Sequence, residues 1–213
     1  MISAERLEGF GRTEKIGGSK SVEEIKKKVL DEEERERAFD AAETDEELLI
    51  IRMLYETGCR RGELAALTPT DINFDSDRNP ATVRIDKTMT SGGKVQNHPK
   101  VKDGNRTVAI SEETKNLLHK HIREEDIGEG ERIFPYSRGT IYQRVKSVFT
   151  RANVRVEKEK TKVTPHWLRH TRATDMVKEG FSKEKVQQYL GHSSVINSEV
   201  YTHFSDDDVV ELY

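Results

Sequence analysis

The feature that most constrains the fold is a series of helix start and stop signals along the chain. Asp31 precedes a charged stretch that we expect to be helical through Ala42. Thr44, with Glu47 three residues later, has the capping-box pattern, in which two side chains satisfy backbone N–H groups at a helix start. Gly58 follows the next apolar run, and glycine commonly ends a helix. Ser21, with Glu24 three residues later, has the same capping-box pattern, so three helices are predicted before residue 60.

Helix start and stop signals also occur in the second half of the chain. Starts are marked by Ser111, by Thr164 followed by Pro165, and by Ser182, and stops by Gly180 and Gly191. Offsets of four, seven and eight residues separate Ile141 from Val145, Val148 and Phe149, which is the stripe of a helix buried on one face. The chain is therefore expected to be mainly α-helical.

Strand signals interrupt the helical pattern near residues 82–110. The segment 82–85 alternates as a strand does, Ser91-Gly92-Gly93 indicates a loop, and residues 100–110 form a hairpin pattern around Asp103-Gly104. These signals predict a small three-stranded antiparallel sheet and an α+β fold. Residues 155–162, which alternate Arg, Glu and Lys, are expected to form a solvated loop.

Composition restricts the cellular setting. The chain is 33% hydrophobic and 35% charged, and no apolar run approaches the roughly 18 residues of a membrane span. No apolar signal-peptide core follows the start of the chain. The single cysteine, Cys59, excludes an internal disulfide and provides no Cys/His zinc pattern. We expect a cytoplasmic protein with no membrane partner.

Charge is distributed unevenly. Residues 1–50 carry 9 basic and 15 acidic side chains, whereas residues 51–205 carry 27 basic and 20 acidic ones. A basic body can follow a phosphate backbone, because local potential rather than whole-chain charge steers a polyanion. Solvated helix faces account for the same charges, so charge alone does not decide between the two interpretations.

Polar groups that can bind an anion gather between residues 164 and 201. His166, Arg169, His192 and Tyr201 all fall in this stretch. Upstream, Arg60 stands at a helix start, although the N-terminal end of a helix favours anions over cations. A bound anion would explain that arginine, and so would an ion pair with Glu63.

Three motifs together resemble the tyrosine recombinases, also called phage integrases. In chain order they are Thr57-Gly58-x-Arg60-x-x-Glu63-Leu64, His166-x-x-Arg169-His170, and Leu190-Gly191-His192-Ser193-Ser194 followed by Tyr201-Thr202-His203. The resemblance covers residues 29–204, which it implies are the catalytic domain. Residues 1–28 would then be an arm or interdomain linker, and residues 205–213 an acidic C-terminal tail.

The resemblance also assigns roles within such a site. It implies that Arg60 and Arg169 clamp the scissile phosphate, that Lys102 is the general acid, that His166 is the base and His192 a hydrogen-bond donor, and that Tyr201 is the nucleophile. Guanidinium groups match phosphate oxygens and stabilise charge that develops in the transition state. Lys100 and Lys94 are alternatives to Lys102, since the lysine lies in a variable hairpin.

Further residues near the motifs have lesser or competing roles. Glu63 is expected to orient the site, Trp167 to contact the phosphate or pack inside, and His170 and His203 to pack. Rival tyrosines, disfavoured by their spacing, are Tyr142, Tyr189 and Tyr213.

The resemblance implies that the partner is double-stranded DNA. It also implies that the protein is a monomer without DNA and a homotetramer when bound to it. The reaction would pass through a 3′-phosphotyrosine without metal, ATP or another cofactor, because the covalent link conserves the free energy of the phosphodiester. Two alternatives stay open, an inactive DNA-binding relative and a type IB topoisomerase-like strand transferase. One departure is that residues 1–28 are too few for the N-terminal helical domain usual in this family.

Overall fold

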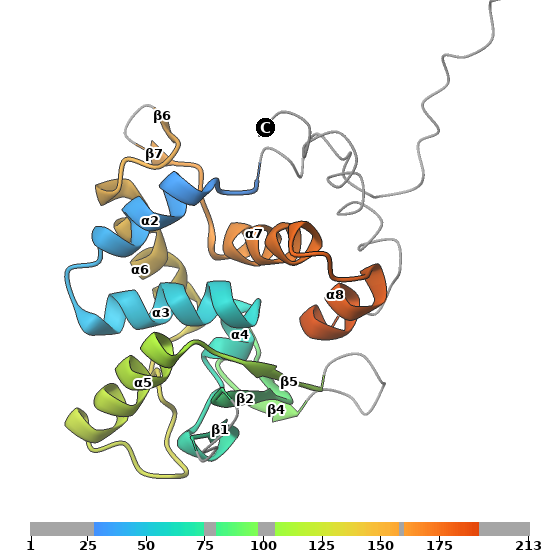
Figure 1. The fold of residues 1–213 in the computed structure, drawn as a ribbon. Helices are drawn as coiled ribbons and strands as arrows, with labels where there is room; N and C mark the ends of the chain where they lie inside the picture. Colours follow the sequence, from blue (N-terminus) through green and yellow to red (C-terminus); the bar gives the residue numbers. More distant parts are fainter. Residues whose placement is uncertain (1–27, 75–79, 98–104, 158–159, 192–213) are drawn as a thin grey trace, which may run out of the picture.

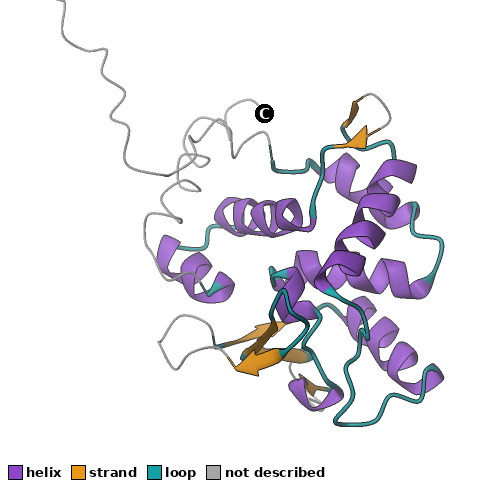
Figure 2. Ribbon diagram, turned by 180° about the vertical axis from the view of Figure 1, so that it is seen from behind, coloured by secondary structure: helices purple, strands orange, loops and turns teal. Residues whose placement is uncertain are grey.

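The structure is a computed structural model, which describes residues 28–74, 80–97, 105–157 and 160–191. Helices surround a central helix, and a small antiparallel sheet lies to one side of it (Figures 1 and 2). The helices are α2 (Glu32–Asp40), α3 (Asp45–Thr57), α4 (Arg61–Leu64), α5 (Glu112–Glu124), α6 (Arg138–Arg151), α7 (Pro165–Lys178) and α8 (Lys183–Leu190). This confirms the expected α+β class with a predominance of helix.

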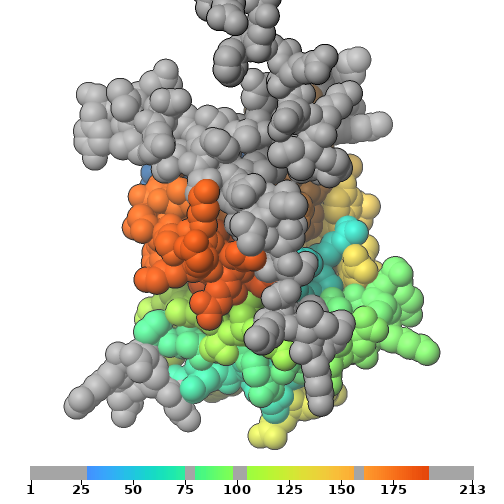
Figure 3. All heavy atoms as spheres, turned by 90° about the vertical axis from the view of Figure 1, so that its right-hand side faces the viewer, coloured from blue at the N-terminus to red at the C-terminus, as the bar shows by residue number. Residues whose placement is uncertain are grey.

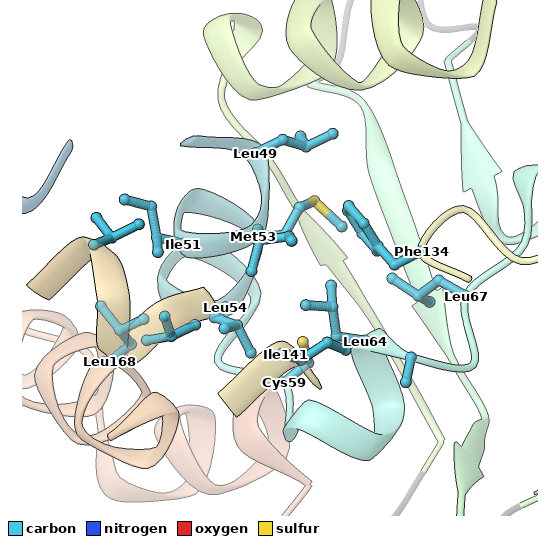
Figure 4. Packing of buried hydrophobic residues seen from close by; sticks show 14 of the residues in the cluster. Leu49, Ile51, Met53, Leu54, Cys59, Leu64, Leu67, Phe134, Ile141 and Leu168 are labelled. Atoms are coloured by element: carbon cyan, nitrogen blue, oxygen red, sulfur yellow. The ribbon is translucent and has the colours of Figure 1, made fainter. Parts of the chain in front are cut away.

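Helix α3 forms the centre because its apolar residues occupy more than one face. Leu49, Ile51, Met53 and Leu54 each have 0% of their surface exposed. A helix that is apolar on several sides must be covered on several sides, and α5, α6 and α7 all pack against α3. Figure 4 shows these four side chains in the core, with Leu168 of α7 among their neighbours. The core thus fixes where α7 begins relative to α3.

The predicted helix ends are found close to their signals. Asp31 and Glu34 form a complete capping box at the start of α2, which ends at Asp40, two residues before the predicted end at Ala42. Thr44 accepts a hydrogen bond from the Glu47 backbone N–H at 3.1 Å, so the α3 cap is confirmed. The Glu47 carboxylate takes the N–H of the residue before Thr44 instead of the N–H of Thr44 itself. The helix start predicted at Ser21 lies outside the described residues.

The C-terminal pair of helices begins and ends as predicted. Thr164 precedes α7, although its side chain makes no capping hydrogen bond, and Pro165 is the first helical residue. Ser182 caps α8 through the Lys185 backbone N–H. Gly191 ends α8 with a φ of +62°, a left-handed conformation that costs glycine little.

The sheet is three-stranded and antiparallel as predicted, but its members differ in part from the predicted ones. Strand β2 (Thr82–Ile85) lies between β1 (Ile72–Asn73) and β5 (Arg106–Ala109). The short β1 was not predicted, and the predicted turn at Asp103-Gly104 lies outside the described residues. Helix α8 lies beside β5, on the face of the molecule turned to the viewer in Figure 3.

A separate hairpin interrupts the connection from β2 to β5. It consists of β3 (Lys87–Met89) and β4 (Val95–Asn97), joined by a turn that contains the predicted Ser91-Gly92-Gly93 loop. Every residue of β4 is exposed. The hairpin therefore projects from the sheet and leaves the pairing of β2 with β5 intact.

The prediction of a solvated loop at residues 155–162 is wrong. Strands β6 (Val156–Glu157) and β7 (Lys160–Thr161) pair there as a small antiparallel hairpin. Arg155 donates from Nε to Glu34 Oε1 at 2.8 Å and so ties the segment to α2. The alternation of charges gave no sign of this pairing, because the partner of Arg155 lies far away in the sequence.

Candidate active site

A cavity of about 630 Å³ opens where α4, the β3–β4 hairpin and the first turns of α6 and α7 meet. It is lined by Cys59, Arg60, Arg61, Gly62, Thr88, Met89, Thr90, Ser91, Gln96, Arg138, Tyr142, Thr164, Pro165 and His166. Three of these side chains are guanidinium groups, and none is a carboxylate. The cavity therefore favours an anionic ligand.

Arg60 forms an ion pair with Glu63 and is also accessible to an anion, the two interpretations that the sequence allowed. It is the residue before the first turn of α4, where an extended backbone conformation sends its side chain toward the cavity. Its Nη1 donates to Glu63 Oε1 at 2.9 Å, yet 46% of the side chain stays exposed. The ion pair holds the guanidinium in place while leaving an edge of it accessible to an anion.

Glu63 is the buried anchor of this corner. Its side chain has 0% exposure and accepts hydrogen bonds from the Arg60 backbone N–H at 2.8 Å and from Arg106 Nη2 at 2.8 Å. Arg106 on β5 is itself only 3% exposed. One carboxylate therefore binds two arginines, and the cluster keeps a net charge of +1. This is the placement expected of a residue that orients Arg60.

Arg169 lies behind the cavity and does not line it. Only 1% of its surface is exposed, and its guanidinium donates to the carbonyl oxygens of Gly58 and Leu190. These carbonyls belong to the C-terminal ends of α3 and α8, where a cation is favoured by the helix dipoles. One side chain thereby joins the backbone just before Arg60 to the backbone just before residue 192.

The histidines of α7 take different positions. His166 is exposed in the first turn and lines the cavity. His170 is buried, with its ring edge-on to that of His166 at a centroid distance of 4.4 Å. Trp167 packs against the core beneath Arg155, whose guanidinium carbon lies 5.3 Å from the indole centre. Trp167 is partly buried and does not line the cavity.

Several predicted site residues are not placed. Lys100, Lys102, His192 and Tyr201 lie outside the described residues, as do His203 and Tyr213. Lys94 is described: it lies in the exposed turn of the β3–β4 hairpin and does not line the cavity. The structure thus brings Arg60 and His166 to one cavity, with Arg169 and Glu63 behind its wall.

Two arginines of the cavity were not singled out by the sequence. Arg61 lies over the ring of Tyr142, with its guanidinium carbon 5.7 Å from the ring centre. Arg138 is the first residue of α6, directly after the capping Ser137. An arginine next to a helix cap, as at Arg60, was the signal that could have drawn attention to Arg138.

The other tyrosines considered as nucleophiles differ in whether they line the cavity. Tyr142 lies in the cavity wall with Arg60 and His166, so it is a real competitor for the nucleophilic role. The Tyr189 hydroxyl donates to the backbone carbonyl of Glu56 and does not line the cavity.

Cys59 lies in the cavity lining but is not a thiolate. Burial, together with the nearby Glu63 carboxylate, raises the pKa of the Cys59 thiol to about 11, so the thiol is protonated at neutral pH. Among the described residues, no three His, Cys, Asp or Glu side chains group closely enough to hold a metal ion. None of the helices in the described ranges has the length and apolar character to cross a membrane.

The fold and the cavity define a helical domain with an arginine- and histidine-lined anion site. The Phage integrase family model matches residues 28–208, and the chain belongs to this family. It is 30% identical over 186 residues to tyrosine recombinase XerA of Saccharolobus solfataricus, covering 87% of this chain and 55% of the relative. The XerA of Pyrococcus furiosus is 32% identical over 183 residues, covering 82% and 57%. The chain thus spans little more than half the length of these relatives.

Solved structures agree with the family assignment. The crystal structure of XerA recombinase superposes with a TM-score of 0.67 at 26% identity, covering 87% of this chain and 62% of that one. The catalytic domain of bacteriophage HP1 integrase gives a TM-score of 0.56 at 22% identity, with 86% and 91% covered. The Tn1549 transposon integrase, in complex with transposon right end DNA, gives 0.65 at 20% identity, with 86% and 65% covered. The last two show likeness of fold.

Proposed function

We propose that this chain is the catalytic part of a site-specific DNA recombinase that cuts and rejoins strands through a 3′-phosphotyrosine. The observation that carries the proposal is the cavity in which Arg60 and His166 meet without any carboxylate in its lining. Membership of the phage integrase family and similarity to tyrosine recombinases support it. The Tn1549 integrase was solved with DNA, which supports double-stranded DNA as the substrate here.

The first step is attack on a backbone phosphorus by the Tyr201 hydroxyl oxygen. A new O–P bond forms, the bond from phosphorus to the 5′-oxygen breaks, and the electron pair leaves with that oxygen. His166 takes the tyrosine proton and Lys102 supplies a proton to the departing 5′-oxygen. Lys100 and Lys94 are the alternatives for this second proton transfer.

Charge on the phosphate is stabilised by the arginines. Arg60 presents its accessible edge to the non-bridging oxygens, and His192 donates a hydrogen bond to them. The motif assigns Arg169 to the same phosphate. Arg169 contacts Gly58, next to the wall residue Cys59, and so supports the inner wall of the cavity.

Rejoining reverses these steps with a different strand. A 5′-hydroxyl of a second duplex attacks the phosphotyrosine, and Tyr201 leaves. The number of phosphodiester bonds is conserved, so the reaction needs no ATP, and the guanidinium groups stabilise the phosphate charge as a metal ion does in other enzymes. Exchange between two duplexes calls for a homotetramer on DNA assembled from monomers.

The test uses a nicked duplex of the cognate site, from which cleavage releases a short fragment and traps the covalent adduct. The adduct should form with the parent chain and be lost in Tyr201→Phe and in Arg60→Ala. Tyr142→Phe is the matched control, because Tyr142 lies in the cavity wall. An adduct that persists in Tyr201→Phe and disappears in Tyr142→Phe would reassign the nucleophile. DNA binding without an adduct on any nicked site would overturn the proposed activity.

A further inference from the structure

Two guanidinium groups of the cavity have no carboxylate partner in the part of the chain that the structure describes. Neither Arg61 nor Arg138 lies within ion-pairing distance of an acidic side chain there, and the buried Nε–H of Arg138 lacks a hydrogen-bond acceptor. Arg60, by contrast, is held by Glu63. Among the described residues, the Nε–H groups of Arg52, Arg106 and Arg172 are buried without an acceptor as well, so the case for Arg138 rests on its place in the cavity lining.

The position of Arg138 depends on a close approach between three elements. A Cβ atom added at Gly62 would lie 2.7 Å from Thr88 Oγ1, 2.8 Å from the Met89 carbonyl oxygen and 3.5 Å from Arg138 Cδ. Glycine at this position therefore lets β3 and the start of α6 close against α4. Arg138 is held within van der Waals reach of the residue two positions after Arg60.

Arg61 is held on the same side by α6. Its guanidinium lies over the ring of Tyr142, which is four residues after Arg138 and so shares its face of the helix. An aromatic ring attracts a cation to its face without neutralising it. The stacking thus directs the Arg61 charge while leaving its hydrogen-bond donors available.

Another part of the cavity lining is neutral and rich in hydroxyl groups. Thr88, Thr90, Ser91 and Gln96 of the β3–β4 hairpin line it. A cavity of about 630 Å³ takes a ligand larger than one phosphate group. Arg60 is enough to bind one phosphate. Arg61 and Arg138 add two positive charges, which a single phosphate would not neutralise.

We propose that Arg61 and Arg138 form a second phosphate subsite, which binds the backbone phosphate next to the one at which the strand is cut. The inference rests on the proposed function for DNA as the ligand. In this subsite the two arginines are positioning residues: they set the register of the strand so that the scissile phosphate meets Arg60.

The test measures binding of the Tyr201→Phe chain to a short labelled DNA duplex of arbitrary sequence by fluorescence anisotropy across a salt series. Each phosphate contact contributes about 0.9 to the slope of log affinity against log salt. Arg138→Gln and Arg61→Gln should each lower the slope, and the double variant, which loses the whole contact with that one phosphate, should lower it by about 0.9. Arg123→Gln, an exposed arginine at the end of α5 that does not line the cavity, is the matched control.

Arg138→Lys separates loss of charge from a folding defect. It keeps the charge, so it should keep the slope, and thermal melting of all variants verifies that they are folded. A slope unchanged in Arg138→Gln, or lowered equally in Arg123→Gln or Arg138→Lys, would overturn the subsite. Because the experiment records binding alone, these slope changes, combined with a parent chain that forms no adduct on nicked DNA, would support the subsite and refute the proposed activity.

Discussion

Replacing Glu63 by glutamine tests how strongly the cavity corner depends on one buried carboxylate. The substitution preserves shape and removes the charge that binds Arg60 and Arg106. The Arg60 pair is half exposed and contributes no more than about 1 kcal/mol. The Arg106 pair is almost fully buried, and removing one partner of a buried pair costs about 3–5 kcal/mol. The buried pair therefore dominates the expected loss.

Urea denaturation followed by circular dichroism measures this loss. With a denaturant slope of about 2 kcal/mol per molar, Glu63→Gln should lower the midpoint by about 2 M. Glu113→Gln is the matched control, because the Glu113 carboxylate pairs with Arg52 but is 61% exposed. Its midpoint should move by less than about 0.5 M.

A double-mutant cycle assigns the loss to Arg106. Arg106→Met removes the buried cation, so combining it with Glu63→Gln should cost clearly less than the sum of the two single changes. A Glu63→Gln midpoint within the range of the Glu113→Gln control would refute the reasoning, since it would mean that the pair contributes no more than an exposed one.

Three further outcomes follow from local geometry. Gly58→Ala should destabilise the fold by about 2–4 kcal/mol in urea titrations, because φ is +58° and the new Cβ would lie 2.5 Å from Leu190 Cδ2. Gly180→Ala is the control: φ is +85° but no atom of the described residues lies within 4 Å of the new Cβ, so only the cost of the left-handed backbone conformation should be measured. Burial pushes the pKa of Asp71 up, but hydrogen bonds from nearby cations and a threonine outweigh it and lower the pKa below 3.8. The stability that Asp71 contributes is therefore present above pH 3.8 and lost as the pH falls through the lowered pKa. Between about pH 5 and about pH 2, the urea midpoint should fall less in Asp71→Asn than in the parent chain. Cys59 should react with a thiol reagent at pH 8 only after unfolding, because burial raises its pKa to about 11; rapid reaction of the folded chain would contradict this.

Helix boundaries were predictable because their causes are local. Ser182 and Gly191 bracket α8 within one turn of each end, and a cap acts over only a few residues. Strand β1 could not be predicted, since its two residues pair only because β2 offers an edge. Strand β4 was missed for a related reason: all of its side chains are exposed, so it carries no alternation of apolar and polar residues.

For the described part of the candidate site, the motifs named residues but not the contacts between elements. The motifs pointed to Arg60 and His166, which share the cavity. They gave no sign that Arg106 binds Glu63, because 43 residues separate the pair. The place of Arg138 was equally hidden, since it depends on how closely α6 approaches Gly62. Contacts across elements cannot be inferred from the spacing of residues along one of them.

The β3–β4 hairpin gives the cavity a wall that can change independently of the fold. Strands β2 and β5 pair directly, so the hairpin between them is an excursion whose length the sheet does not determine. Insertions in such exposed connections cost little free energy, because closure entropy grows slowly with loop length. The hairpin can therefore lengthen or shorten, and so reshape this wall of the cavity, while α4, α6 and α7 stay in place.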